Sequence, residues 1–119
     1  MSDTETEQEI QAKGLTAPRI TPADIEAEIS GNFYYHLREC KPYLPHGTLN
    51  PFTASEFAAV SNLTLCVLVL RNGFTVTGES ACASPENFDA ELGRKIARQN
   101  AVAKIWPLLG FRLRDKLAA

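Results

Sequence analysis

Two polar residues interrupt the apolar side of a predicted helix in the second half of the chain. Asn100 and Lys104 are one helical turn apart, and at about 100° per residue they fall beside Gly93 and Ala97. A polar pair on such a face must be hydrogen-bonded or must line a cavity. Either Asn100 binds a loop carbonyl while Lys104 extends to water, or the pair lines a recessed pocket whose cation binds an anionic ligand.

Groups that suit a nucleotide lie near this pair in the sequence. A nucleotide needs a flat ring on which its base can stack, an amide for hydrogen bonds and fixed positive charge. Phe88 opens the predicted helix, and Arg71 and Phe74 meet at the tip of a predicted hairpin. Together with Asn100 and Lys104 they provide all three groups. The pattern therefore predicts a ligand site, although each group is also common in proteins that bind nothing.

Motifs for catalysis and metal binding are not found in the sequence. It has no Ser-His-Asp spacing, no phosphate-binding P-loop and no Gly-rich dinucleotide motif. The three cysteines, Cys40, Cys66 and Cys82, form no Cys-x-x-Cys, and neither His36 nor His46 completes a zinc spacing. We therefore expect a protein that is not an enzyme, that needs no cofactor or metal, and that works in a reducing cytoplasm.

Length and composition indicate one globular domain. The chain has 119 residues, of which 45% are hydrophobic. No apolar run approaches the roughly 20 residues of a membrane-spanning helix, and the first residues lack the basic and apolar regions of a secretion signal. The formal net charge of −2 makes general attraction to nucleic acid unexpected. We therefore expect neither a membrane nor a nucleic acid as the partner.

The elements that must position these groups begin with a β-hairpin. Residues 64–71 and 74–81 read as strands, and Asn72-Gly73 between them predicts a two-residue type I′ turn. That turn predicts the pairs Arg71–Phe74, Val69–Val76, Val67–Gly78 and Leu65–Ser80. The first strand is apolar on both faces, so we expect one face to pack on the chain's own helix and the other on a second copy of the protein.

One long helix is predicted after the hairpin. Ser84 suits its N-cap, Pro85 suits its first position, and Pro107 and Gly110 mark its end after Trp106. Its large apolar residues share one side, and a strip of small residues lies beside them (Phe88, Leu92, Ile96, Ala103 and Trp106; Gly93, Ala97 and Ala101). A second, short helix is expected after Pro107.

The first sixty residues are less regular. Residues 1–20 are polar and acidic and predict a disordered arm. Thr21-Pro22 begins a short helix that Gly31-Asn32 ends. Residues 33–61 are rich in aromatic residues and broken by prolines and Gly47. They predict an irregular insertion with one helical turn after Thr53. This insertion either has no role in function or forms a wall of the ligand site.

These elements predict an α+β fold over residues 21–119, with its core at about residues 63–117. An antiparallel hairpin or small sheet packs on one long C-terminal helix, and a short helix precedes it.

Five short motifs lie between about Leu63 and Leu117: Leu70-Arg71-Asn72-Gly73-Phe74-Thr75-Val76-Thr77-Gly78-Glu79-Ser80-Ala81-Cys82, Pro85-Glu86-Asn87-Phe88-Asp89, Gly93-Arg94-Lys95-Ile96-Ala97, Asn100-Ala101 and Lys104-Ile105-Trp106. Through these motifs the sequence resembles a family of small phage and prophage proteins. The family is associated with anti-defence proteins that counter Thoeris immunity. Such proteins sequester the cyclic ADP-ribose-type signal of bacterial TIR-domain enzymes without cleaving it. The resemblance implies a homo-oligomer, a dimer or an assembly of dimers, with ligand pockets at subunit boundaries, in the host bacterial cytoplasm.

The resemblance also implies roles for single residues. Phe88 is the stacking aromatic, with Phe74 second, and Asn100 makes the polar contact. The cations that bind phosphate are among Arg71, Arg94, Lys104 and Lys116. The sequence departs from the family pattern at Leu109-Gly110-Phe111, where an acidic residue, Gly and Tyr are usual, and in its longer segment 33–61.

Two other functions stay open from the sequence. Strands followed by a helix that begins Gly93-Arg94-Lys95-Ile96-Ala97 are similar to a double-stranded RNA-binding module. The chain would also suit a phage accessory protein with a structural role or a protein partner.

Overall fold

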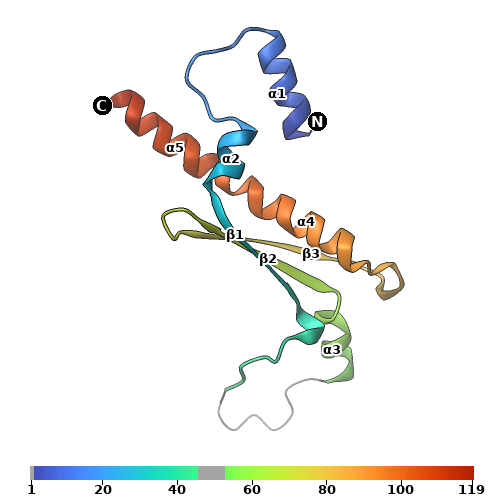
Figure 1. Cartoon of the computed structure of the whole chain (residues 1–119). Helices are drawn as coiled ribbons and strands as arrows, with labels where there is room; N and C mark the ends of the chain where they lie inside the picture. Colours follow the sequence, from blue (N-terminus) through green and yellow to red (C-terminus); the bar gives the residue numbers. More distant parts are fainter. Residues whose placement is uncertain (1, 46–52) are drawn as a thin grey trace.

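The computed structural model describes residues 2–45 and 53–119 of the chain (Figure 1). Its centre is a three-stranded antiparallel sheet in the order β1 (Ile29–His36), β2 (Leu63–Leu70), β3 (Thr75–Ala81). Helix α4 (Ala90–Ala103) lies along one face of this sheet, and α5 (Ile105–Ala118) continues past its end. The shorter helices are α1 (Asp3–Ala12), α2 (Pro22–Glu28) and α3 (Ala54–Val60), with 3₁₀ turns η1 (Leu37–Glu39) and η2 (Pro85–Asn87). The predicted α+β fold is confirmed.

The hairpin between β2 and β3 has a three-residue loop. Leu70 N–H donates to the Phe74 carbonyl at 2.8 Å, and Gly73 N–H donates to the Leu70 carbonyl at 2.9 Å. Gly73 has a φ of 87°, a left-handed conformation that favours glycine. A type I turn closed by a left-handed glycine is the usual form of three-residue hairpin loops. The predicted two-residue turn is therefore wrong.

The longer loop shifts the register by one residue. The observed partners are Val69–Thr75, Leu68–Val76, Val67–Thr77, Cys66–Gly78 and Leu65–Glu79. A shift of one residue moves every side chain of a strand to the other face. As a result Val76 and Gly78 share the face of Leu68 and Cys66, which is the face that α4 covers.

Strand β1 was not predicted. The sequence predicts a short helix that ends at Gly31-Asn32 and an irregular segment after it, whereas α2 ends at Glu28 and residues 29–36 form an edge strand. Its residues, ISGNFYYH, show no alternation of apolar and polar types, and five of the eight are exposed in the structure. Pairing with β2, seen in Phe33–Val67 and Tyr35–Leu65, defines the strand instead.

Helix α4 packs on the sheet through its strip of small residues. Ala97 and Ala101 are fully buried against β2 and β3, whereas Leu92 and Ile96 remain 51% and 37% exposed. A Cβ built on Gly78 would lie 2.2 Å from the Ala97 carbonyl oxygen. Glycine at this point of β3 therefore lets the helix backbone approach the strand closely.

The long C-terminal helix is divided in two. Its first helix begins at Ala90, with the Asp89 carboxylate accepting from Leu92 N–H at 3.0 Å, while Ser84 and Pro85 belong to η2. It ends at Ala103, and α5 begins at Ile105 with Pro107 in its first turn. Proline is tolerated there because the first N–H groups of a helix have no hydrogen-bond partner within the helix. The predicted start at Ser84 and the predicted end at Pro107 and Gly110 are both wrong, since α5 includes Pro107 and Gly110.

The N-terminal segment is a helix in the structure, whereas the sequence analysis expected a disordered arm. A capping box between Ser2 and Glu5 starts α1, which buries none of its residues. An ion pair between Arg19 and Glu7 and a hydrogen bond from Trp106 Nε1 to Asp3, 3.1 Å long, attach it to the rest of the chain.

The segment expected to be an irregular insertion contains the second half of β1, η1 and α3. Thr53 caps α3 through a capping box with Glu56, as predicted. His46, Gly47 and Pro51, which the sequence analysis used, lie outside the described residues.

One face of the sheet is left uncovered. Phe33 and Tyr35 of β1 are 51% and 45% exposed, and they lie beside Val67 and Leu65 of β2, which are only half-buried. The chain is also extended: its radius of gyration is 18.6 Å, against about 13.5 Å for a compact domain of this length. Within the described part of a single chain, α4 covers one face of β2 and the other face is open, so the second copy expected on that face stays a prediction.

Candidate functional site

A cluster of cationic and aromatic side chains lies where β1 ends and α4 begins. His36 is the last residue of β1, Arg38 belongs to η1, Phe88 precedes α4 and Arg94 lies in the second turn of α4. We call these four residues the His36 cluster. Its members come from the edge strand, the turn that follows it, the segment before α4 and α4 itself, so the fold is needed to bring them together.

His36 is the centre of this cluster. Its Nε2 lies 3.1 Å from Arg94 Nη1, and its Nδ1 lies 3.3 Å from Thr64 Oγ1 on the neighbouring strand. Phe88 meets the imidazole edge-on, with ring centroids 6.1 Å apart. The guanidinium of Arg38 stands over the Phe88 ring at 4.9 Å from its centroid, a cation–π contact.

The two arginines of the cluster take no part in the ion pairs of the described residues. The described ion pairs use Lys13, Arg19, Arg98 and Arg112. Within residues 2–45 and 53–119, neither Arg38 nor Arg94 forms an ion pair. Asp89, next to Phe88 in the chain, uses its carboxylate to cap α4. An arginine without a carboxylate partner can bind a phosphate through two parallel hydrogen bonds.

Asn100 and Lys104 line none of the three hollows described below for residues 2–45 and 53–119. Both are exposed, and Asn100 Nδ2 donates to the Glu79 carbonyl of edge strand β3 at 2.8 Å. Lys104 is the residue between α4 and α5. The interpretation in which Asn100 binds a main-chain carbonyl and Lys104 extends to water is the one the structure fits, although the carbonyl belongs to a strand. The hollow expected around the pair is absent from the described residues of the single chain.

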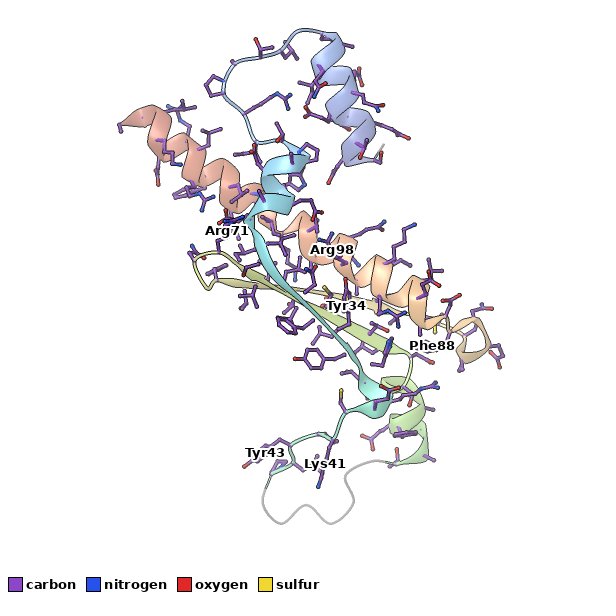
Figure 2. All side chains as sticks on the ribbon, viewed as in Figure 1. Tyr34, Lys41, Tyr43, Arg71, Phe88 and Arg98 are labelled. Atoms are coloured by element: carbon purple, nitrogen blue, oxygen red, sulfur yellow. The ribbon has the colours of Figure 1, made fainter. Side chains whose placement is uncertain are left out.

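Arg71 and Phe74 lie at the far end of the sheet from the His36 cluster. Figure 2 shows Arg71 and Phe88 at opposite ends of the sheet. Arg71 donates through Nε to the Ala27 carbonyl, and Phe74 is 54% exposed. The structure thus separates the predicted site residues, and of these Phe88 and Arg94 alone belong to the His36 cluster.

Lys116 belongs with Arg71 in a second basic group around Glu28. Two hydrogen bonds from Arg112, of 2.9 and 3.0 Å, lower the pKa of the Glu28 carboxyl, and the charges of Arg71 and Lys116 lower it further. Because Arg112 already satisfies this carboxylate, the group around Glu28 is explained by its role in joining α2 to α5.

Three hollows of the described surface differ in size and lining. The one beside Phe88 has a volume of about 90 Å³ and also touches Thr64, Cys82, Leu92 and Gly93. This is well below the roughly 300–1,000 Å³ of small-molecule pockets. A larger hollow of about 630 Å³ lies between α1 and α4, where Arg98 is paired with Glu26. The third, of about 240 Å³, lies between α1, Ile20 and Trp106.

Sequence reasoning missed His36 and Arg38 as site residues. Their place depends on β1, whose pairing sets His36 opposite Thr64. The available signal was a histidine and an arginine two residues apart after an aromatic run. That signal has no meaning until the strand is recognised.

Comparison with protein families identifies one match. Residues 20–117 match the phage protein (N4 Gp49/phage Sf6 gene 66) family, which is most of the chain. The chain belongs to this family. Comparisons with curated proteins and with solved structures found no match. In the described part of this phage protein, no helix is both long and apolar enough to cross a membrane.

Proposed function

We propose that this phage protein is an anti-defence protein that sequesters a cyclic ADP-ribose-type nucleotide and blocks Thoeris immunity. It binds the signal in the host bacterial cytoplasm and releases it uncleaved, so it is not an enzyme. The proposal starts from the resemblance of its sequence to such proteins. Membership of a phage protein family is consistent with it.

The His36 cluster is the observation that carries the proposal. Phe88 offers a ring, while Arg38 and Arg94 offer positive charge that no described carboxylate neutralises. A base stacked on an aromatic ring gains about 1–3 kcal/mol, and a pyrophosphate suits two nearby arginines. The cluster therefore provides the two kinds of contact that a cyclic ADP-ribose-type ligand requires.

Self-association is part of the proposal. The hollow beside Phe88 is too small to enclose a nucleotide, so a second chain would have to enlarge the site. The uncovered face of the sheet, with Phe33, Tyr35 and Val67, lies on the opposite side from the His36 cluster and is a separate apolar surface that a second copy would cover. A homo-oligomer joined there would also give the extended chain a larger common core.

Native mass spectrometry with cyclic ADP-ribose, and separately with an extract that contains an activated TIR-enzyme product, tests the proposal. We expect an oligomer carrying bound nucleotide, and chromatography after heat release should recover that nucleotide unchanged. Nucleotide recovered in hydrolysed form, or no binding from either source, would refute the proposal. A 16-base-pair RNA duplex, about the length that double-stranded RNA-binding domains span, serves as the nucleic-acid control.

Substitution of Phe88 tests the site itself. We expect Phe88→Ala to weaken nucleotide binding about tenfold or more, because it removes the stacking ring. Phe111→Ala is the matched control, since Phe111 is 71% exposed on α5 and lies outside the cluster. Equal affinity of the two variants would place the ligand elsewhere.

A further inference from the structure

The hydrogen bonds of His36 define which of its nitrogens carries the proton. Arg94 has only N–H donors and no acceptor. Its Nη1 lies 3.1 Å from His36 Nε2, so Nε2 must accept this hydrogen bond and carries no proton. A neutral imidazole then has its proton on Nδ1, which donates to Thr64 Oγ1 at 3.3 Å.

Thr64 is held in place at one end of the hydrogen-bonded series Arg94–His36–Thr64. The residue is only 1% exposed, near the start of the central strand β2. On the helix side it faces Gly93, where an added Cβ would lie 3.0 Å from Thr64 Oγ1. The hydroxyl therefore sits between β1 and α4, and little room remains for the Thr64 side chain to move.

We propose that His36 is a positioning residue of the nucleotide site: its neutral imidazole, protonated at Nδ1, connects buried Thr64 to Arg94 and holds the Arg94 guanidinium ready for a phosphate group. This inference rests on the proposed function for its ligand, a nucleotide phosphate. One Arg94 nitrogen is engaged by His36, and the other N–H groups of the guanidinium stay available for phosphate oxygens. Holding a long side chain in place in advance reduces the entropy lost when the ligand binds.

The surroundings of His36 make its charge state important. His36 contacts Arg94 of α4 and Thr64 of β2. It also contacts the ring of Phe88 from the segment before α4, and the Arg38 guanidinium packs over that Phe88 ring. No carboxylate hydrogen-bonds to the ring within the described residues. A second proton would turn Nε2 into a donor that faces the donors of Arg94, and the contact would be lost.

Nitrogen-15 NMR of the ligand-free protein tests the hydrogen-bonding part of this inference. The other histidine, His46, is replaced by Asn so that one ring remains. We expect the Nδ1-protonated form at neutral pH, and in the R94A variant we expect the Nε2-protonated form to appear. R38A is the control and should leave the ring unchanged. An Nε2-protonated ring in the unaltered protein, or a ring that R94A does not affect, would overturn the inference.

Binding of cyclic ADP-ribose tests the positioning part. We expect H36A to weaken binding about tenfold, the effect of one hydrogen bond to a charged group, and H36Q to stay within about threefold because its amide oxygen can accept from Arg94. H36A that binds as well as the unaltered protein, or H36Q that binds as weakly as H36A, would overturn the inference. If the unaltered protein binds no nucleotide, the proposed function fails, and the positioning part fails with it.

Discussion

Gly78 is the point at which the observed register and the packing of α4 can be tested together. It lies on β3 opposite Cys66, on the face that α4 covers. A Cβ at this position would lie 2.2 Å from the Ala97 carbonyl oxygen and 2.3 Å from the Ala101 nitrogen. Both obstacles are backbone atoms of the helix, so no side chain can rotate away. In the register predicted from a two-residue turn, Gly78 would instead share a face with Val67.

We therefore expect Gly78→Ala to be strongly destabilising. Ordinary contacts of a Cβ are 3.4–4 Å, so α4 would have to move by more than 1 Å and would lose contact with the sheet. Overpacking of a core typically costs 1–3 kcal/mol. Because only backbone can yield here, we expect about 3 kcal/mol or more. For a chain of this length, that corresponds to a fall in Tm of about 10 °C or more.

Gly110→Ala provides the matched control for this prediction. Gly110 lies inside α5, an added Cβ there meets nothing within 4 Å, and its φ is not positive. The same change should therefore stabilise the protein by about 0.5–1 kcal/mol, because alanine favours helix and restricts the unfolded chain. Urea denaturation followed by circular dichroism at 222 nm measures both variants. If Gly78→Ala is as stable as the unaltered protein, the register and the close approach of α4 are both refuted.

Three further predictions concern the open face, the edge strand and acid stability. Val67→Lys should lower the mass measured by light scattering, because it places a charge in the middle of the uncovered sheet face; an unchanged mass would exclude this face as the interface. Asn100→Ala should lower the free energy of unfolding by about 1 kcal/mol, because the Glu79 carbonyl loses its hydrogen bond, and a concurrent loss of nucleotide affinity would indicate that Asn100 also contacts the ligand. The lowered pKa of the Glu28 carboxyl stabilises the folded protein above the ordinary value of 4.5, and this stabilisation is lost as the pH falls below it. Arg112→Ala should therefore lower the free energy of unfolding by about 1 kcal/mol at pH 7. In denaturation measured at a series of acidic pH values, the variant should also lose less stability as the pH falls.

Local sequence determined much of the secondary structure. The strands around Asn72-Gly73, the capping box from Thr53 to Glu56 and the helix start at Thr21-Pro22 are present in the structure. These features depend on residues close together in the chain, whose φ preferences and hydrogen bonds act within one turn. The strip of small residues on α4 was also visible in the sequence. That it would be the face packed on the sheet was not, because a glycine and two alanines bury little area by themselves.

Tertiary structure decided the register and the site. Whether Asn72-Gly73 forms a two- or three-residue loop changes the face of Gly78, and the close packing of α4 fits the three-residue form. Strand β1 exists because β2 offers it a pairing edge, and without that strand His36 has no place beside Thr64 and Arg94. Local preferences act over a few residues, whereas contacts between residues 28 and 58 positions apart arise only when the sheet and helix have assembled. For this reason the sequence suggests Phe88 and Arg94 as candidate site residues, whereas only the fold places His36 beside both of them.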